Sequence, residues 1–417
     1  MTQIVFLTLF LGLTMGRQPV SVDVAGPVAR VEITLDGQPA ATLASAPWTA
    51  NIDFGSHLLP RRLVARALDA SGNELARVEQ RVNVPHAPAE AALVVESQTA
   101  RLVWQSIDTE KPKDVQWMLD GARLNASSVR ASLPALDPGK PHLLRAIATS
   151  ASGEVAEAEI VFGGGLTGVA ASALTAIPVR VDNDADLSKA ITVNGEPAQI
   201  VAVERVPADI IFVRDPSLSD FALRIDVENR VHRRSGAIDL GGSRVPIEKK
   251  QGIRFFWPVA VRKRGTTTAD LFPSSRTFFV ADAPAIRSVL ANISAPSSEQ
   301  LRFADAVAVA ALQAAASRRP RAVVLITGSQ HRDASQLTPQ QTKEYLASIG
   351  VPLYVWTTVE TPTEWGEARR IDGSERVRDA AADLLQEVQR QRIVWIAGDY
   401  MLDEIAVSGS AKALWNR

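Results

Sequence analysis

Hydrophobic and polar residues alternate through the front of the chain, and short turn motifs divide the alternating runs. Every second residue from Val31 to Leu35 is apolar, and the run ends at Asp36-Gly37, a dipeptide typical of two-residue hairpin turns. The same order of apolar run and turn returns at Leu119-Asp120-Gly121. A second hairpin pattern follows each of these, with turns at Ser71-Gly72-Asn73 and Ser152-Gly153. The sequence therefore predicts two consecutive β-sandwiches built from short strands.

The stretch that begins at Ala46-Pro47-Trp48 and runs to Ser71-Gly72-Asn73 resembles the immunoglobulin-like repeats of bacterial proteins. The resemblance implies modules that act as spacers or stalks for another domain. We expect the first module at residues 17–86 and the second at residues 87–163. The tryptophans of this region are expected in the cores or over strand edges; they are Trp48, Trp104 and Trp117.

A glycine-rich stretch then matches a dinucleotide-binding fingerprint in form, with Gly163-x-Gly165-x-x-Gly168 directly after a strand pattern. That fingerprint requires a helix to begin at the last glycine, where its N-terminus binds pyrophosphate. Here Pro178 and a strand-like alternation follow within ten residues. The pattern favours a linker and a small β element over residues 164–207, with a turn at Asn194-Gly195.

The chain changes its period at residue 208, from where apolar strand patterns alternate with helical ones. This order is typical of a parallel sheet flanked by helices. The expected strands are 209–213, 253–259, 322–327, 351–356 and 393–398, and the expected helices are 282–293, 301–317, 338–350 and 374–391. Thr338 and Gln341 form a capping-box signal, and Gly350 marks the end of that helix.

Several segments of the back half, in order, resemble the von Willebrand factor type A domain. Strand 209–213 and the following Asp215-Pro216-Ser217-Leu218-Ser219 resemble the first motif of the family's metal-ion-dependent adhesion site. Residues 304–335 resemble its next helix, strand and loop, and residues 349–358 resemble a later strand. The resemblance implies a Rossmann-like, doubly wound α/β domain over residues 208–417, with its site at the C-terminal edge of the sheet. It also implies a helix from Leu218 to about residue 234, where the pattern alone fits either a strand or a helix.

The candidate metal ligands are Asp215, Ser217 and Ser219, which could offer one carboxylate and two hydroxyl oxygens to Mg²⁺ or Mn²⁺. The family adds a threonine and a second aspartate from two further loops. Leu301 stands about where the threonine is expected, and Gly328 replaces the aspartate.

Asp333 follows five residues after Gly328, outside the family's motif. We therefore expect a weakened metal site. The alternative is that Asp215 and the serines only cap the following helix.

Composition narrows the functional classes further. Of the 417 residues, 46% are hydrophobic and 22% charged, as in a folded protein. The net charge of −1 gives the chain no overall electrostatic attraction for nucleic acid. Basic clusters at residues 230–234, 262–264 and 318–321 are interpreted as solvated edges. The absence of cysteine excludes disulfides and thiolate chemistry, and the five histidines show no paired zinc spacing.

The first residues contain an apolar run from Ile4 to Met15 that precedes the first charge, Arg17. Its length fits the core of a secretory signal, which we place at residues 1–16. The alternatives are a buried first strand and a start codon assigned too late. The sequence contains no other candidate for a membrane span.

These observations favour a non-catalytic, exported protein, located in the periplasm, on the cell surface or outside the cell. Its binding surface for a protein partner would be the loops around Ser217, residues 328–333 and residues 357–360. One alternative is a structural component of the cell envelope without an ion site. Another is an enzyme that binds a small molecule or nucleotide at the same sheet edge. The sequence indicates neither the partner nor the oligomeric state.

Overall fold

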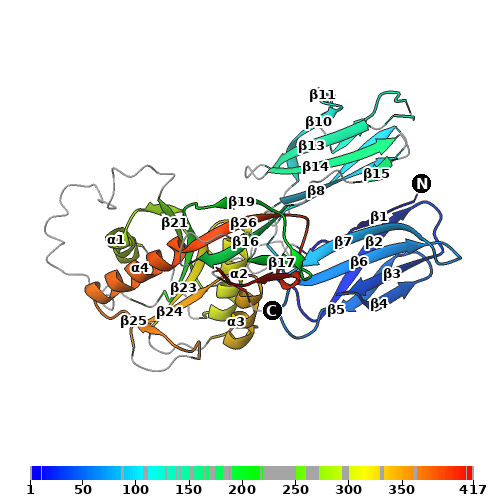
Figure 1. Ribbon diagram of the computed structural model, residues 1–417. Helices are drawn as coiled ribbons and strands as arrows, with labels where there is room; N and C mark the ends of the chain where they lie inside the picture. The colour runs from blue at the N-terminus through cyan, green and yellow to red at the C-terminus, as the bar shows by residue number, and fades with distance from the viewer. Residues whose placement is uncertain are drawn as a thin grey trace. The chain divides into compact units, whose positions relative to one another are not determined.

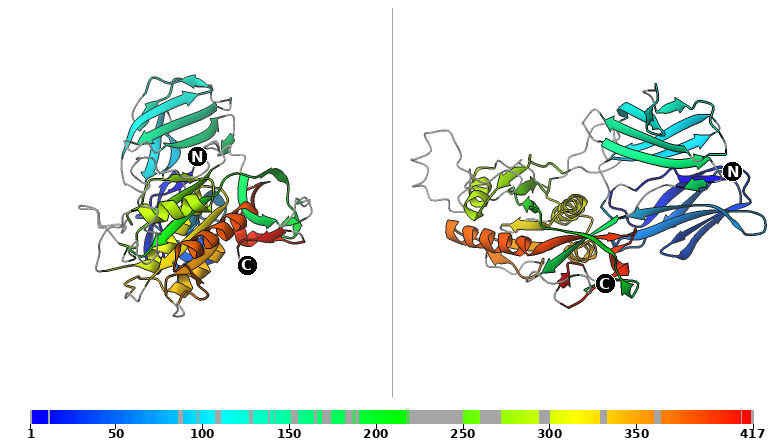
Figure 2. Two further views of the ribbon diagram at one scale, coloured as in Figure 1. Left: turned by 90° about the vertical axis from the view of Figure 1, so that its left-hand side faces the viewer. Right: turned by 45° about the horizontal axis from the view of Figure 1, so that its top comes forward.

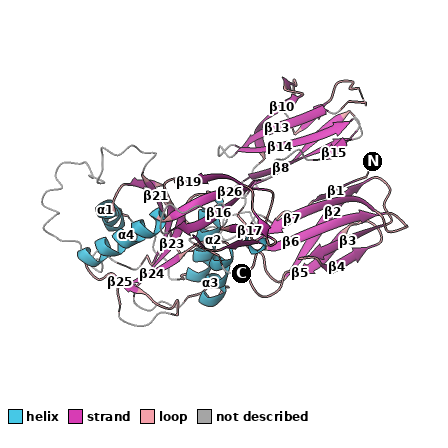
Figure 3. Ribbon diagram, viewed as in Figure 1, coloured by secondary structure: helices cyan, strands magenta, loops and turns pink. Residues whose placement is uncertain are grey.

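The computed structural model contains two compact units, formed by residues 1–55 with 61–173 and by residues 56–60 with 174–417 (Figure 1). The residues that the structure describes are 2–10, 12–85, 89–96, 98–106, 111–126, 129–137, 139–140, 142–150, 155–163, 166–168, 174–181, 187, 190–216, 218, 250–259, 272–293, 300–328, 333–359, 364–409 and 411–415. All the helices among them lie in the second unit (Figure 3).

The first module of the front unit is a two-sheet β-sandwich. Its sheets have the orders β1-β2-β5 and β4-β3-β6-β7. The strands are β1 (Gln3–Phe6), β2 (Arg17–Ala25), β3 (Arg30–Leu35), β4 (Gln38–Leu43), β5 (Thr49–Asp53), β6 (Arg61–Leu68) and β7 (Glu74–Val82). Residues 3–6 pair antiparallel with β2 and bury Ile4 and Phe6 in the core of this sandwich. This segment thus has the arrangement of a buried first strand, and the module begins earlier than the expected residue 17.

The second module repeats the strand order of the first and adds β15 at one edge, which confirms the prediction of two related sandwiches. Its sheets have the orders β12-β9-β8 and β11-β10-β13-β14-β15. The strands are β8 (Ala89–Glu96), β9 (Thr99–Ser106), β10 (Pro112–Leu119), β11 (Ala122–Arg123), β12 (Arg130–Ser132), β13 (His142–Ser150), β14 (Val155–Gly163) and β15 (Leu166–Gly168). Trp117 is fully buried in its core. Gly168 lies in β15, which pairs antiparallel with β14, so the helix of a dinucleotide-binding fingerprint does not begin there.

Both predicted Asp-Gly hairpins are present. Asp36 and Gly37 have φ angles of 50° and 77°, and Asp120 and Gly121 have φ angles of 50° and 81°. Two consecutive positive φ angles define the turn type whose twist matches that of paired strands. The dipeptides therefore set the register of the β3–β4 and β10–β11 hairpins.

The back unit contains a six-stranded sheet with the order β22-β21-β20-β23-β24-β25, parallel except for β22. The strands are β20 (Asp209–Arg214), β21 (Gln251–Phe256), β22 (Phe278–Val280), β23 (Arg321–Thr327), β24 (Leu353–Thr357) and β25 (Arg369–Arg370). In chain order this is 3-2-1-4-5-6, a doubly wound arrangement. The order reverses between β20 and β23.

Helices cover both faces of this sheet (Figure 2). The helices are α1 (Ala283–Asn292), α2 (Phe303–Ala316), α3 (Pro339–Ser348) and α4 (Ser374–Gln389). Helices α1 and α4 pack in one core with alternate residues of β20, β21 and β23, whereas α2 contacts β20, β23 and α3. The predicted capping box of α3 is present, because Thr338 Oγ1 accepts the Gln341 N–H and Gln341 Oε1 accepts the Thr338 N–H.

Residues 393–398 were expected as a fifth strand of the parallel sheet, and this assignment is wrong. Residues 393–397 belong to β26 (Gln391–Ala397), which pairs antiparallel with β16 (Leu174–Val181) and β19 (Ile200–Glu204). The remaining elements of this small β layer are β17 (Ile191–Val193), β18 (Glu196–Pro197), the short helix η3 (Leu402–Glu404), β27 (Ile405–Val407) and β28 (Ala411–Ala413). The small β element expected before residue 207 is therefore present as β16 to β19, and β16 and β19 pair with a strand near the C-terminus. An apolar run indicates a buried strand but not the sheet to which it belongs.

Arg321 was grouped with a solvated basic edge, and the structure contradicts this. Its side chain is buried, and its guanidinium donates to the carbonyl oxygens of Gly350 (3.1 Å), Ala315 (3.0 Å) and Ile349 (3.3 Å). Burial lowers the pKa of Arg321 to about 10. The side chain joins the C-terminal ends of α2 and α3, where helix carbonyls lack partners and attract a cation.

Among the described residues, no helix is both long enough and apolar enough to span a membrane.

Candidate functional site

Asp215 directly follows β20, at the position where the strand order of the sheet reverses. Its backbone N–H donates to the Ile326 carbonyl on β23 at 2.9 Å. The carboxylate is almost completely buried, and its Oδ2 accepts the N–H of Gly328 at 3.3 Å. Asp215 and Gly328 therefore lie together at the C-terminal edge of the two central parallel strands, as the sequence predicted.

Leu218 fills the space where a side chain at position 328 would lie. A Cβ atom added to Gly328 would be 2.5 Å from Leu218 Cδ2 and 3.3 Å from Asp215 Oδ2. Contacts as short as 2.5 Å between carbon atoms do not occur, so the leucine would have to move. An apolar residue thus lies where the side chain of a second aspartate, implied by the resemblance, would stand.

Arg214 fixes the loop that contains Asp215 and Leu218. Its guanidinium donates to the Leu218 carbonyl at 2.7 Å and to the Leu290 carbonyl, near the end of α1, at 2.9 Å. It also lies 6.0 Å from the ring centroid of Trp257. The buried arginine therefore holds the start of this loop against the end of α1.

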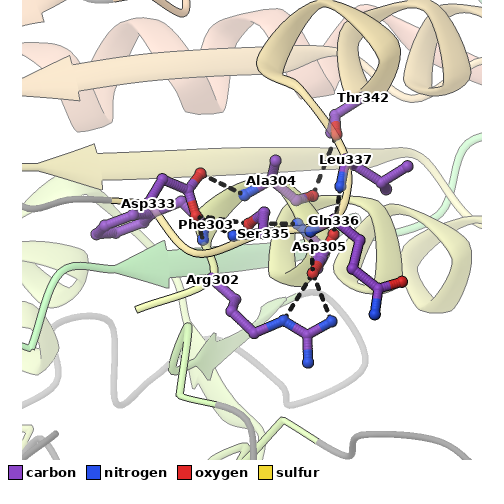
Figure 4. Close-up of polar contacts among 9 residues, drawn as sticks. All are labelled: Arg302, Phe303, Ala304, Asp305, Asp333, Ser335, Gln336, Leu337 and Thr342. Atoms are coloured by element: carbon purple, nitrogen blue, oxygen red, sulfur yellow. Dashed lines mark hydrogen bonds and ion pairs between the residues drawn. The ribbon is translucent and has the colours of Figure 1, made fainter. Parts of the chain in front are cut away.

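Asp333 is not placed as a metal ligand, because its carboxylate caps helix α2 (Figure 4). Oδ1 accepts the N–H of Phe303 at 2.9 Å, and Oδ2 accepts that of Ala304 at 3.2 Å. Oδ1 also accepts the N–H and the hydroxyl of Ser335, at 3.0 and 2.6 Å. Helix α2 lacks a cap from its own N-cap residue, Arg302, so a carboxylate from the loop after β23 satisfies its first N–H groups.

Asp305, in the first turn of α2, makes the complementary contacts to the same loop (Figure 4). Its oxygens accept the N–H groups of Gln336 and Leu337, both at 3.0 Å. Oδ2 also accepts the Nε and Nη2 groups of Arg302, at 2.7 and 2.6 Å. Asp305 and Asp333 thus clamp helix and loop to one another. Sequence reasoning missed this clamp because its partners are about 30 residues apart and no local motif connects them.

The structure describes some of the other predicted site residues and leaves others outside its described ranges. Leu301 is buried and forms an isolated parallel bridge with Asp333, so this position offers an apolar side chain and no hydroxyl. Thr357 ends β24 on the same edge, and its hydroxyl accepts the Val359 N–H at 3.2 Å. Ser217, Ser219, His331 and the segment from residue 219 to residue 249 lie outside the described residues.

A divalent ion would find few ligands at this edge among the described residues. Asp215 offers its carboxylate, whereas position 328 has no side chain and both oxygens of Asp333 accept hydrogen bonds from α2 and its own loop. The part of the chain that the structure describes contains no group of three or more acidic or histidine side chains placed to hold a metal. Asp215 is thus the one predicted ligand that the structure describes, since Ser217 and Ser219 lie outside the described residues.

No known family model matches the chain, and no curated protein matches it. Among solved structures, the chain is similar to the fibronectin(III)-like modules of Clostridium thermocellum CbhA, with 17% identity over 40% of this chain and 97% of the other, at a TM-score of 0.17. It is also similar to Bacteroides ovatus SGBP-B in complex with a mixed-linkage heptasaccharide (13% identity, 48% and 58% coverage, TM-score 0.15).

A third match is proximal thread matrix protein 1 from the mussel byssus (13% identity, 51% and 50% coverage, TM-score 0.26). With TM-scores this low, the matches support no conclusion about this chain. The strand orders of the two front modules show by themselves that both are all-β sandwiches.

Proposed function

We propose that this chain is an exported, non-catalytic binding protein. In this proposal, two immunoglobulin-like modules precede a von Willebrand type A-like domain whose metal site is degenerate. The partner is a protein, and it contacts the C-terminal edge of the parallel sheet. The modules serve as spacers that hold this edge away from a surface.

The observation that carries the proposal is the position of Asp215 and Gly328. They lie where the order of the doubly wound sheet reverses, between β20 and β23. In open α/β sheets, ligands bind outside the carboxyl ends of the strands at this point. Two carboxylates are described at this edge, those of Asp215 and Asp333, and both accept backbone N–H groups. Carboxylates engaged in this way support a binding surface rather than a catalytic pair of acid and base.

The proposed contact does not depend on a tightly bound ion. Leu218 occupies the place of a second carboxylate side chain, and Asp333 caps α2. One carboxylate alone compensates little of the cost of dehydrating Mg²⁺ or Mn²⁺. When an ion does bind, it would supply a positive charge for a carboxylate of the partner, and Asp215 would hold it.

Calorimetric titration of the full chain with Mn²⁺ and Mg²⁺ tests the degenerate site. We expect no saturable binding by the wild type up to about 10 mM, far above the range of tight divalent sites. The double variant Leu218→Ala with Gly328→Asp makes room for a second carboxylate beside Asp215 and is expected to bind Mn²⁺ with a Kd of roughly 0.1–1 mM.

The control is the same double variant with Asp215→Asn, which is expected to lose the acquired binding. Tight binding by the wild type would show that the site is intact rather than degenerate. Absence of binding by a folded double variant would show that this edge is not related to the adhesion-site family.

A second pair of variants tests the binding edge itself. Val359 follows β24 on this edge, whereas Val203 is exposed on β19 of the small β layer. When the immobilised chain is exposed to cell-envelope proteins, we expect Val359→Arg to lose a partner that the wild type and Val203→Arg retain. Equal retention by both variants would place the binding surface elsewhere.

A further inference from the structure

His142 opens strand β13 in the second module, and oxygen acceptors face both of its ring nitrogens. Nδ1 lies 2.7 Å from Asp120 Oδ2, and Nε2 lies 3.3 Å from the Asp137 carbonyl oxygen. A neutral imidazole has one N–H group, whereas the imidazolium ion has two. Only the protonated ring can donate to both acceptors, so this geometry fits a charged histidine.

The first module has a permanent cation at the corresponding position. Arg61 opens β6, and its guanidinium donates to Asp36 Oδ2 at 2.7 Å and to the Phe54 carbonyl at 3.4 Å. Asp36 and Asp120 are the first residues of the two equivalent hairpin turns. Phe54 and Asp137 both lie in the loop between the fifth and sixth strands of their module.

The backbone contacts of the two aspartates are also equivalent. Asp36 Oδ1 accepts the Arg62 N–H, and Asp120 Oδ1 accepts the Leu143 N–H, each at 2.8 Å. In both modules the aspartate therefore pins the hairpin turn to the start of the sixth strand. The cation then ties the same turn to the preceding loop. The two modules differ in whether this cation can lose its proton.

We propose that His142 is a proton-operated clamp of the second module. When protonated, it ties the β10–β11 turn to the β12–β13 loop, and when neutral it releases one of these contacts. Arg61 holds the first module in the same way at every physiological pH, since a guanidinium stays charged. The chain would thus contain one fixed module and one whose turn and loop loosen as the pH rises.

The groups around His142 favour its charged form. Asp120 faces it from the β10–β11 turn, and Asp137 lies in the β12–β13 loop, where Lys140 pairs with the Asp137 carboxylate at 3.6 Å. From β14, the ring of Phe162 contacts the imidazole at a centroid distance of 6.0 Å. The hydrogen bond to Asp120, followed by that to the Asp137 carbonyl, raises the pKa of His142 against the opposing effect of burial.

The direction of the pH dependence follows from this shift. A histidine whose pKa is higher in the folded than in the unfolded protein contributes its full stabilisation below its ordinary pKa of about 6.5. That contribution is lost as the pH rises through the folded pKa. The same hydrogen bond, followed by the Leu143 N–H, lowers the pKa of Asp120, so this carboxylate stays charged across the window.

Hydrogen exchange of the full chain between pH 5.5 and 8.5, corrected for the intrinsic exchange rate, tests the clamp. Amides of β10, β11 and the start of β13 are expected to lose protection as the pH rises, while those of β3, β4 and β6 keep theirs. The expected loss is about tenfold for each unit by which the folded pKa of His142 exceeds 6.5. His142→Arg is expected to remove the pH dependence and keep the protection seen at low pH.

In the reciprocal variant Arg61→His, the amides of β3, β4 and β6 are expected to acquire the same pH dependence. An NMR titration of His142, assigned by its loss in His142→Gln, provides a measurement that does not depend on stability. A pKa at or below 6.5 would overturn the proposal. So would an unchanged pH-dependent loss of protection in a folded His142→Arg variant.

Discussion

Replacing Arg321 with methionine is expected to lower the free energy of unfolding of β23 and its neighbours by about 3–4 kcal/mol. Methionine keeps most of the volume but removes the donors for the carbonyl oxygens of Ala315, Ile349 and Gly350. These carbonyls lie at the ends of α2 and α3, and each would lose a charged donor. The Ala315 carbonyl would keep the Arg318 N–H, at 3.2 Å. Arg321→Lys is expected to recover only part of the loss, because an ammonium group lacks the planar fork that reaches all three.

Hydrogen exchange of the β23 amides in the full chain measures this local free energy without requiring the whole chain to unfold in one step. The matched control is Arg319→Met, two residues away and exposed, for which a change within about 0.5 kcal/mol is expected. If Arg321→Met were as stable as Arg319→Met, the helix ends would not depend on the buried guanidinium.

Replacing Asp333 with alanine is expected to lower the stability of α2 by about 2–3 kcal/mol. The variant loses a charge at the helix N-terminus as well as the acceptors for Phe303, Ala304 and Ser335. Asp333→Asn keeps one carbonyl oxygen in place and is expected to lose about half as much. Exchange of the amides in the first turns of α2 is the measurement.

Asp282 provides the comparison for this effect within the same unit. It caps α1 through one hydrogen bond to the Ala285 N–H, at 2.9 Å. Asp282→Ala is therefore expected to cost about 1 kcal/mol, the ordinary value for an N-cap. Equal losses in the two alanine variants would mean that the additional contacts of Asp333 contribute nothing to the helix.

Local signals in the sequence were sufficient for the turns, caps and most elements. Asp36-Gly37 and Asp120-Gly121 specify positive φ angles through their own residue types, and the Thr338–Gln341 capping box is contained in four residues. Helices α1 to α4 were predicted with boundaries within a few residues of those observed. Each of these features depends on contacts between neighbours in the chain, which a sequence pattern records.

Features that depend on distant contacts were not predictable in the same way. The run in β26 has the apolar character of a buried strand, but its partners, β16 and β19, lie about 190 to 220 residues earlier. Arg321 resembles its exposed neighbours in sequence, and only the convergence of two helix ends makes it a buried residue. Likewise, Asp333 was considered for an ion because nothing local indicated that α2 would need its carboxylate.

At the candidate site, the sequence predicted which edge of the parallel sheet is involved, but not how the side chains pack there. The resemblance to a von Willebrand type A motif predicted that Asp215 and Gly328 would share one edge of the sheet, and the structure brings them within hydrogen-bonding distance. The sequence shows a glycine at position 328, but not that Leu218 fills the space beside it, because nothing local relates residue 218 to residue 328.

The pairing of β16 and β19 with β26 has a consequence for the order of events on the ribosome. About 190 residues separate β19 from β26, and the whole parallel sheet is encoded between them. At 5–20 residues per second, roughly 10–40 seconds of translation pass before these early strands can meet their partner. Throughout that interval the edges of β16 and β19 are unpaired and can pair with other nascent chains. We therefore expect holdase chaperones to bind the segment from β16 to β19 before β26 is made.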